Sequence, residues 1–238
     1  FSPLLKMLGE TVIMNINHAE VLHYLGYKGQ QADENTTRLI DECLDEIDGL
    51  AQRKYVYEFF TVTREEGSIA LKDSILTFPG RDIKRHLQHS GRCALMAVTL
   101  GLKVDQRIAF YSRLDLSRGI VLDACASAAI EALCDQVEAK IRARAGREGL
   151  YITSRYSPGY GDFPLEMQQG IMAVLDAYRK IGLSVTERSL LIPRKSVTAV
   201  IGLQGKPPDQ NCTYSKCEAC ANLDCELRRD GKGCDKRN

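Results

Sequence analysis

One segment near the middle of the chain gathers side chains that could hold a charged, flat ligand. It reads Arg-Tyr-Ser-Pro-Gly-Tyr-Gly-Asp-Phe-Pro-Leu over residues 155–165. Arg155 offers a planar fork of donors that matches a carboxylate or phosphate, and the aromatic rings offer faces for a base or a sulfonium-bearing ligand. Two glycines and two prolines restrict the backbone of the segment. We interpret it as a structured binding loop; an ordered surface loop with Arg155 in an ion pair is the alternative.

A second concentration of reactive side chains lies near the carboxyl end. Five of the nine cysteines fall between positions 212 and 234, in a polar stretch without apolar periodicity. Such a stretch is not expected to order without a ligand. Four thiolates could hold zinc or an iron–sulfur cluster, and a disordered tail with free thiols is a third reading. The candidate ligands are Cys217, Cys220 and Cys225, with Cys212 or Cys234 as the fourth.

Composition restricts the class of protein that carries these two features. The chain has 238 residues, 44% hydrophobic and 26% charged, with a formal net charge of +1. This balance is ordinary for a globular protein and favours neither nucleic acid nor an anionic membrane as a partner. No apolar run is long enough to span a bilayer, and residues 1–9 lack the features of a signal peptide. We therefore expect a cytoplasmic protein.

Helical patterns lie on both sides of the central loop. Residues 17–27 predict a short helix capped by Asn17, and residues 33–50 predict a longer amphipathic one. After the loop, residues 166–181 predict a single helix ended by Gly182. These elements are expected to pack rather than to carry chemistry.

The longest helical pattern ends near Ala145 and precedes the loop. Residues 123–129 give it a face of small side chains, which would let it pack closely against a sheet or a ligand. Glu131 and Asp135 follow, one turn apart on the same helix.

Strand patterns are rich in aromatic, β-branched and apolar residues. They cover residues 54–62, a hairpin formed by 68–71 and 74–78, and residues 196–203; residues 93–100 form an apolar run that ends at Gly101. Helices and strands occur in clusters without regular β-α-β alternation. This order predicts an α+β fold with an antiparallel sheet and flanking helices.

The motif R-Y-S-P-G-Y at 155–160 resembles the R-x-x-x-G-Y signature of the S-adenosylmethionine-binding reactivation (activation) domain of vitamin B12-dependent methionine synthase. The small-faced helix before it, the turn at 161–164 after it and the stretch 193–198 are similar in order and spacing to stand-alone relatives of that domain. Residues 17–29 and 82–87 resemble their amino-terminal half. The resemblance implies a twisted antiparallel sheet, a family domain over residues 10–204 and a separate Cys-rich tail over 205–238.

The resemblance also implies roles for individual residues. Arg155 would hold the methionyl carboxylate, and Tyr160 would wall the site. The main chain from Tyr156 to Gly159 would contact the adenine or ribose, and Glu131 is the closest match to a helix acid that contacts the ligand. The expected ligand-binding residues are therefore Glu131, Arg155, Tyr156, Ser157, Pro158, Gly159 and Tyr160. No side chain is expected to act as a catalytic acid, base or nucleophile.

The family resemblance implies reductive methylation of cob(II)alamin, with S-adenosylmethionine as methyl donor and one added electron. The cobalamin would belong to a methionine synthase core or a related corrinoid protein met in trans, and flavodoxin or ferredoxin would supply the electron. Because this reaction consumes an electron, an iron–sulfur cluster is favoured over zinc in the tail. The alternative is a non-catalytic corrinoid-protein-binding or chaperone-like partner with a structural zinc tail.

Overall fold

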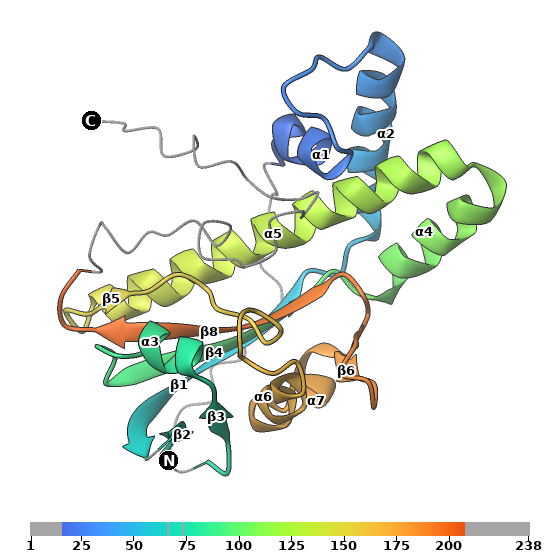
Figure 1. The fold of residues 1–238 in the computed structure, drawn as a ribbon. Coiled ribbons are helices and arrows are strands. Elements are labelled where there is room, and N and C mark those ends of the chain that lie inside the picture. Colours follow the sequence, from blue (N-terminus) through green and yellow to red (C-terminus); the bar gives the residue numbers. More distant parts are fainter. Residues whose placement is uncertain (1–15, 66, 73, 208–238) are drawn as a thin grey trace.

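The computed structural model describes residues 16–207 apart from positions 66 and 73. The five cysteines predicted to bind a metal or cluster, Cys212 to Cys234, lie outside these residues. In the part of the chain that is described, no helix is long and apolar enough to cross a membrane. Figure 1 shows a sheet with a long helix running across one face and shorter helices on the other.

An antiparallel sheet of six strands forms the centre of the fold, as predicted. The spatial order of its strands is β3-β2-β1-β4-β8-β5, and every neighbouring pair is antiparallel. The hairpin predicted after residue 68 is formed by β2 and β3. In spatial order the strands are β3 (Thr77–Pro79), β2 (Ser68–Leu71), β1 (Lys54–Glu65), β4 (Arg92–Thr99), β8 (Ser196–Gln204) and β5 (Tyr151–Ile152).

Two hydrophobic cores lie on opposite faces of this sheet. Strand β4 contributes to both, because alternate side chains of a strand point to opposite faces: Ala94 and Met96 lie in one core, Cys93 and Leu95 in the other. This explains why the sequence of β4 reads as an unbroken apolar run rather than an alternating one. Burial also raises the pKa of the Cys93 thiol to about 12.

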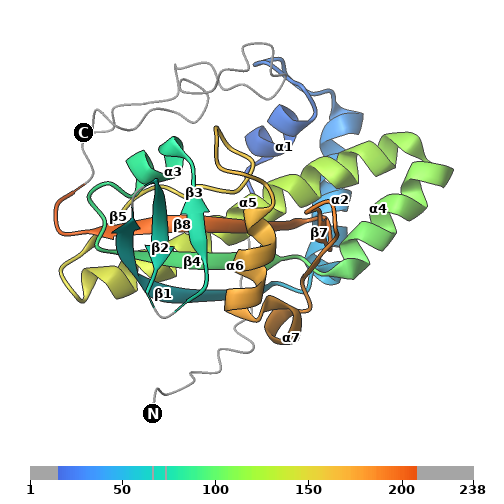
Figure 2. The ribbon, with the colours of Figure 1, turned by 60° about the horizontal axis from the view of Figure 1, so that its bottom comes forward.

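Helices cover both faces, as Figures 1 and 2 show from two directions. On the first face, α5 (Leu116–Gly146) lies over the sheet, and α1 (His18–Tyr24), α2 (Glu34–Leu50) and α4 (Leu102–Leu114) pack against α5. The second packs against α3 (Arg81–His86), α6 (Met167–Leu175) and α7 (Ala177–Ile181). The predicted cap of α1 is present, since the side chain of Asn17 accepts from the Ala19 N–H, and the side chain of Asp33 caps α2 by accepting from the Thr36 N–H. These bonds satisfy amides that have no partner within their own helix.

The long helix α5 has the small, buried face that its sequence predicts. Ala124, Ala126, Ala128 and Ala129 are all buried on it. Near its start, Gly119 lets α4 approach closely, because a Cβ there would lie 2.9 Å from the Ser112 nitrogen. The position of α5 over the sheet is therefore set by small residues rather than by interlocking large ones.

The prediction of a single helix over residues 166–181 is wrong. The chain forms α6 and α7, separated by Asp176 in the left-handed conformation with φ of 51°. Aspartate tolerates this region better than most residues, and the resulting turn lets Ala177 and Ile181 of α7 pack into the second core. Gly182, with φ of 71°, ends α7 as predicted. A two-stranded sheet of β6 (Ser184–Val185) and β7 (Leu191–Ile192) follows.

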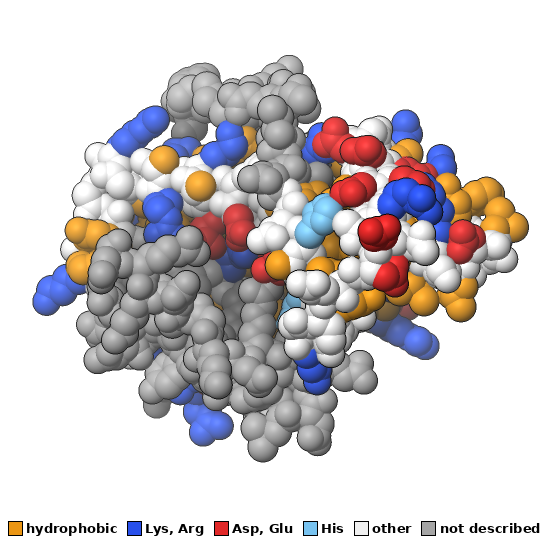
Figure 3. Space-filling model, turned by 90° about the horizontal axis from the view of Figure 1, so that it is seen from above, with side chains coloured by type: hydrophobic (Ala, Val, Ile, Leu, Met, Phe, Trp, Pro, Cys, Tyr) orange, Lys and Arg blue, Asp and Glu red, His pale blue; other side chains and the backbone are white. Residues whose placement is uncertain are grey.

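The surface carries mixed charge, in keeping with the net charge of the chain. Figure 3 shows acidic and basic side chains side by side over the region of α1 and α2. Hydrophobic side chains gather at the turn between α4 and α5, which forms the right-hand end of the molecule in Figures 1 and 3. The exposed apolar residues there are Phe110, Leu114, Leu116 and Ile120.

Candidate functional site

The loop predicted to bind a ligand, residues 155–165, is fixed to the scaffold at both ends. At its start, Tyr156 forms two main-chain hydrogen bonds with Val200 of β8, of 2.9 and 2.8 Å. Towards its end, the carboxylate of Asp162 accepts from the N–H groups of Arg81 and Asp82, at 2.7 and 2.9 Å. These bonds cap helix α3, and they hold the pKa of Asp162 below its usual value. The loop is thus an ordered element.

Gly161 is required where the loop meets α3. Its φ is 53°, and a Cβ at this position would lie 2.2 Å from Oδ2 of Asp82 and 2.9 Å from the hydroxyl of Tyr156. The same Asp82 oxygen accepts a hydrogen bond from the Asp162 N–H at 3.2 Å. Any side chain at 161 would therefore push the loop away from the helix that holds it.

Aromatic rings support the loop from beneath. The ring of Tyr156 stacks between His86 of α3 and Phe163, with centroid distances of 5.0 and 6.0 Å. Its hydroxyl donates to the Tyr160 carbonyl at 3.2 Å. Burial, together with the carboxylates of Asp82 and Asp162, raises the pKa of Tyr156 to about 12. Tyr156 is therefore a packing residue, whereas Tyr160 stands 46% exposed on the outer side of the loop.

Arg155 points at helix α5 and is surrounded by its carboxylates. Its Nη1 lies 2.7 Å from Asp135 and 3.4 Å from Glu138, and its Nη2 lies 3.1 Å from Glu131. The Arg155 side chain is 12% exposed, while that of Asp135 is 72% exposed. We call these four residues the Arg155 cluster.

Glu131 was predicted to belong to the site; Asp135 and Glu138 were not. The only signal for them is that acids at 131, 135 and 138 fall on one face of the predicted helix.

Beside the loop, β8 has an open edge, in the sense that no strand of the described residues pairs with its first residues on the side away from β4. In its ladder with β4, alternate residues bond to β4 and the main chain of the others points outward. Val200 points outward to Tyr156, and Gly202 accepts from the Thr153 N–H at 2.9 Å. Thr198 has the same orientation as Val200 because it lies two residues away. Thr198 is nevertheless buried, with 2% of its surface exposed, and its hydroxyl donates to Oε1 of Gln168 at 3.2 Å.

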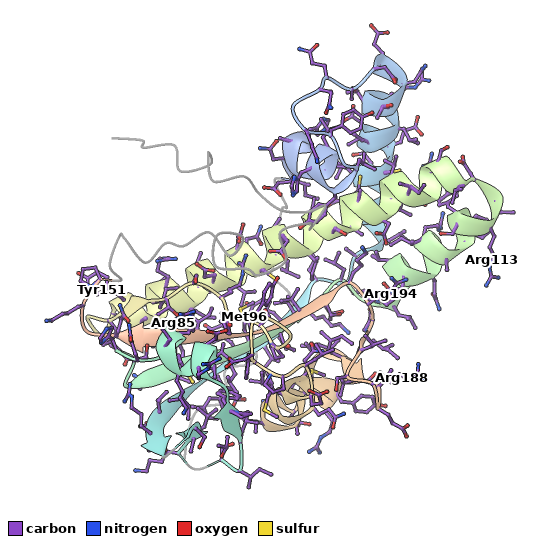
Figure 4. The ribbon with its side chains drawn as sticks, viewed as in Figure 1. Arg85, Met96, Arg113, Tyr151, Arg188 and Arg194 are labelled. Atoms are coloured by element: carbon purple, nitrogen blue, oxygen red, sulfur yellow. The ribbon has the colours of Figure 1, made fainter. Side chains whose placement is uncertain are left out.

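A hollow of about 300 Å³ lies at the other end of this open edge. It begins where Lys195 precedes β8, and Figure 4 shows Arg113 and Arg194 on that side of the molecule. Lys195 is held in place by Asp123 at 3.0 Å and Ser127 at 2.8 Å. The lining residues are Asp105, Ile108, Ala109, Ser112, Arg113, Asp123, Arg194 and Lys195.

The hollow and the Arg155 cluster are joined by one face of α5. Asp123 lines the hollow and Glu131 contacts Arg155, and helix geometry separates these two positions by about 12 Å. Two main-chain N–H groups of the loop are already used within the protein and cannot donate to a ligand. The Tyr156 N–H is bonded to Val200, and the Gly159 N–H donates to the Phe163 carbonyl at 2.8 Å. Of the predicted main-chain contacts, the Ser157 N–H is the donor with no partner among the described residues.

Comparison with known proteins bears on this site. Residues 68–214, more than half of the chain, match the family described as "Vitamin B12 dependent methionine synthase, activation domain". The fold is similar to that in the crystal structure of the MetH reactivation domain bound to AdoHcy, with a TM-score of 0.60 and 19% sequence identity. The similarity covers 75% of this chain and 71% of that one. No curated protein matches the chain.

Proposed function

Because the chain belongs to the family of activation domains of vitamin B12-dependent methionine synthase, we propose that it binds S-adenosylmethionine and supports the reductive methylation of cobalamin. The corrinoid would be carried by a separate methionine synthase core or a related methyltransferase. The observation that carries this proposal is the position of Arg155, held at the junction of the R-x-x-x-G-Y loop, helix α5 and the open edge of β8.

The residues around Arg155 are suited to the amino-acid end of such a ligand. A guanidinium can bind the methionyl carboxylate through two hydrogen bonds. Asp135, which is exposed, can move from Arg155 to the ligand ammonium, and Glu131 lies on the same side. The site therefore offers a partner of opposite sign to each charge of an α-amino acid.

The other end of the ligand would lie along the loop. The Ser157 N–H offers a hydrogen-bond donor without a partner among the described residues. Tyr160 is exposed on the outer side of the loop and would cover one side of the nucleoside. Pro158 is buried and would act by fixing the backbone rather than by contact.

The role of this protein in the reaction would be placement. One electron and the methyl donor convert an inactive Co(II) corrinoid to its methylated form, and the cobalt and the sulfonium supply that chemistry. No protein acid or base is required, so the chain contributes by binding the donor with its methyl group facing the partner. The partner and an electron donor such as flavodoxin or ferredoxin would be met in trans.

Calorimetric titration with S-adenosylmethionine tests the proposal. We expect saturable binding by the full chain and a loss of at least tenfold in affinity for Arg155→Ala, because a charge-assisted pair is removed. Arg38→Ala is the matched control, since Arg38 is exposed on α2 and contacts Asn35 of the same helix. Absence of binding, or equal affinity of the Arg155→Ala variant, would contradict the assignment. Either result would favour the non-catalytic, partner-binding alternative.

The cysteine-rich tail remains part of the proposal. We propose that Cys217, Cys220 and Cys225, with Cys212 or Cys234, hold an iron–sulfur cluster that serves electron entry. These residues lie outside the described part of the chain, and the proposal depends on their spacing and on the electron that the reaction needs. Iron and acid-labile sulfide in anaerobically purified protein would support it, whereas stoichiometric zinc alone would show a structural site.

A further inference from the structure

The hollow at the start of β8 is lined by charged side chains that the proposed function does not use. We propose that it is a second binding site, which takes a small organic phosphate between Arg113 of α4 and Arg194 before β8. Asp123 on its wall lies about 12 Å along α5 from Glu131 of the Arg155 cluster. Binding here would therefore be independent of the methyl donor.

Both acids of the hollow are already occupied by groups of the protein. The carboxylate of Asp105 accepts from the main-chain N–H groups of Arg194 at 2.5 Å and Lys195 at 3.4 Å, which fixes the turn that leads into β8. The carboxylate of Asp123 pairs with the ammonium of Lys195 at 3.0 Å. Lys195 also donates to the hydroxyl of Ser127 at 2.8 Å. Neither acid therefore neutralises a guanidinium of the hollow.

The two arginines of the hollow are left with free guanidinium groups. Arg113 and Arg194 are both exposed, and neither guanidinium has an ion pair or hydrogen bond with another described residue. Figure 4 shows both on the same side of the molecule, and both line the same hollow. By contrast, Arg107 on the same helix as Arg113 is paired with Glu46 at 2.6 Å. Two unpaired guanidinium groups at one concave place are suited to an oxyanion.

The size and lining of the hollow narrow the class of anion. Its volume of about 300 Å³ exceeds that of a bare oxyanion and lies at the lower end of the range for ligand pockets. Ile108 and Ala109 of α4 add apolar lining, which suits an organic body attached to the anion. A carboxylate has two oxygens, and the fork of a single arginine can occupy both. A phosphate ester has three terminal oxygens, so it can accept from both arginines at once.

Titration calorimetry of the full chain with phenyl phosphate tests this site. We expect saturable binding that is weakened about tenfold by Arg113→Gln and by Arg194→Gln, because each removes a charge-assisted hydrogen bond. Arg188→Gln is the matched control and should bind as the wild type does, since Arg188 is an exposed arginine on the same side that does not line the hollow. Benzoate, with two oxygens, and inorganic phosphate, without an apolar body, should each bind more weakly than phenyl phosphate.

Each contrary result would overturn a specific part of the assignment. If the wild type does not bind phenyl phosphate, the hollow is not a binding site. An equal loss in Arg188→Gln would show attraction by overall charge, and benzoate binding as tightly as phenyl phosphate would contradict the phosphate class.

S-adenosylmethionine separates this site from the proposed function. Its affinity should be unchanged in Arg113→Gln and Arg194→Gln, and phenyl phosphate should not compete with it. Competition between the two compounds would show one shared site and would overturn the second one. If the wild type binds phenyl phosphate but not S-adenosylmethionine, the second site stands and the proposed function fails.

Discussion

Helix α5 carries two arginine–carboxylate clusters, one at each side of its centre, and they differ in charge balance. Near its start, Arg118 contacts Glu42 at 2.8 Å and Glu46 at 3.0 Å, and Arg107 contacts Glu46 at 2.6 Å. We call this the Arg118 cluster. Its two arginines and two glutamates balance, whereas the carboxylates outnumber the arginines around Arg155.

The two clusters also join different kinds of element. The Arg118 cluster connects three helices, with its acids on α2 and its arginines on α4 and α5, and Arg118 also lies 5.0 Å from the ring of Tyr111. The Arg155 cluster connects a helix to a loop and includes a carboxylate that is largely exposed. Balanced charge with shared partners indicates a structural contact. Surplus charge with an exchangeable partner indicates a place for a ligand.

Replacing each arginine by alanine in turn should give the largest test of the difference between the two clusters. Arg155→Ala should lower the affinity for S-adenosylmethionine by tenfold or more. Arg118→Ala should lower the free energy of unfolding by about 2 kcal/mol, because it leaves partly buried Glu46 with one partner fewer. Calorimetric titration and chemical denaturation of both variants provide the two measurements.

The two variants are expected to differ in ligand affinity, which Arg155→Ala should reduce and Arg118→Ala should leave unchanged. A strong loss of ligand affinity in Arg118→Ala, without a loss of stability, would contradict this expectation. So would an Arg155→Ala variant that loses stability but binds the ligand normally. Either result would show that charge balance does not distinguish the two clusters.

A glycine substitution should show that the Arg155 cluster depends on the shape of its loop. Gly161→Ala places a methyl group 2.2 Å from Asp82 at a φ of 53°, so we expect a loss of about 1–3 kcal/mol in unfolding free energy. Ligand affinity should fall with it. Gly146→Ala is the matched control, because nothing lies within 4 Å of a Cβ there. An equal effect of the two substitutions would show that the loop is not clamped against α3.

The smallest expected effect is a pH dependence centred on Tyr156. Its pKa is raised to about 12 from the usual 10, so the folded state holds the phenol proton more tightly than the unfolded state. The resulting stabilisation is complete below about pH 10 and is lost as pH rises through about 12. Tyr156→Phe should therefore lose less stability across this range than the wild type, measured by denaturation at each pH.

Tyr178→Phe controls for the loss of a phenol, because Tyr178 is 72% exposed. It should follow the wild-type curve between pH 10 and 12. If Tyr156→Phe also follows that curve, the ring of Tyr156 is not enclosed by the loop, and the loop is more open than the structure shows.

Local sequence patterns predicted most of the fold because they act over short distances. Asn17 indicated the start of α1 and the segment that begins at Asp33 indicated that of α2, while aromatic and β-branched content indicated β1. The break at Asp176 was not predictable from periodicity, since the apolar spacing continues across it and one residue with positive φ redirects the chain. Packing of Ala177 and Ile181 in the second core accounts for the turn.

The candidate site was predicted only where its residues are neighbours in sequence. The loop around Arg155 was recognised from its own composition, and Glu131 from a family resemblance. The contacts of Arg155 with Asp135 and Glu138 join residues about 20 positions apart. These contacts form because the loop passes from β5, at the edge of the sheet, to helix α5. That geometry depends on β5 and on the Tyr156–Val200 pairing, which single-sequence patterns do not specify.

The anchoring of the loop on β8 has a consequence for how this site would vary among relatives. Tyr156 is held by the N–H and C=O of Val200, which are atoms that every residue except proline possesses. Position 200 could therefore take any apolar residue that fits the second core while the loop stayed anchored. In an alignment, proline would be avoided at this position and no single residue would be retained. A search for site positions by shared side chains would pass over this contact, although it fixes where the loop lies.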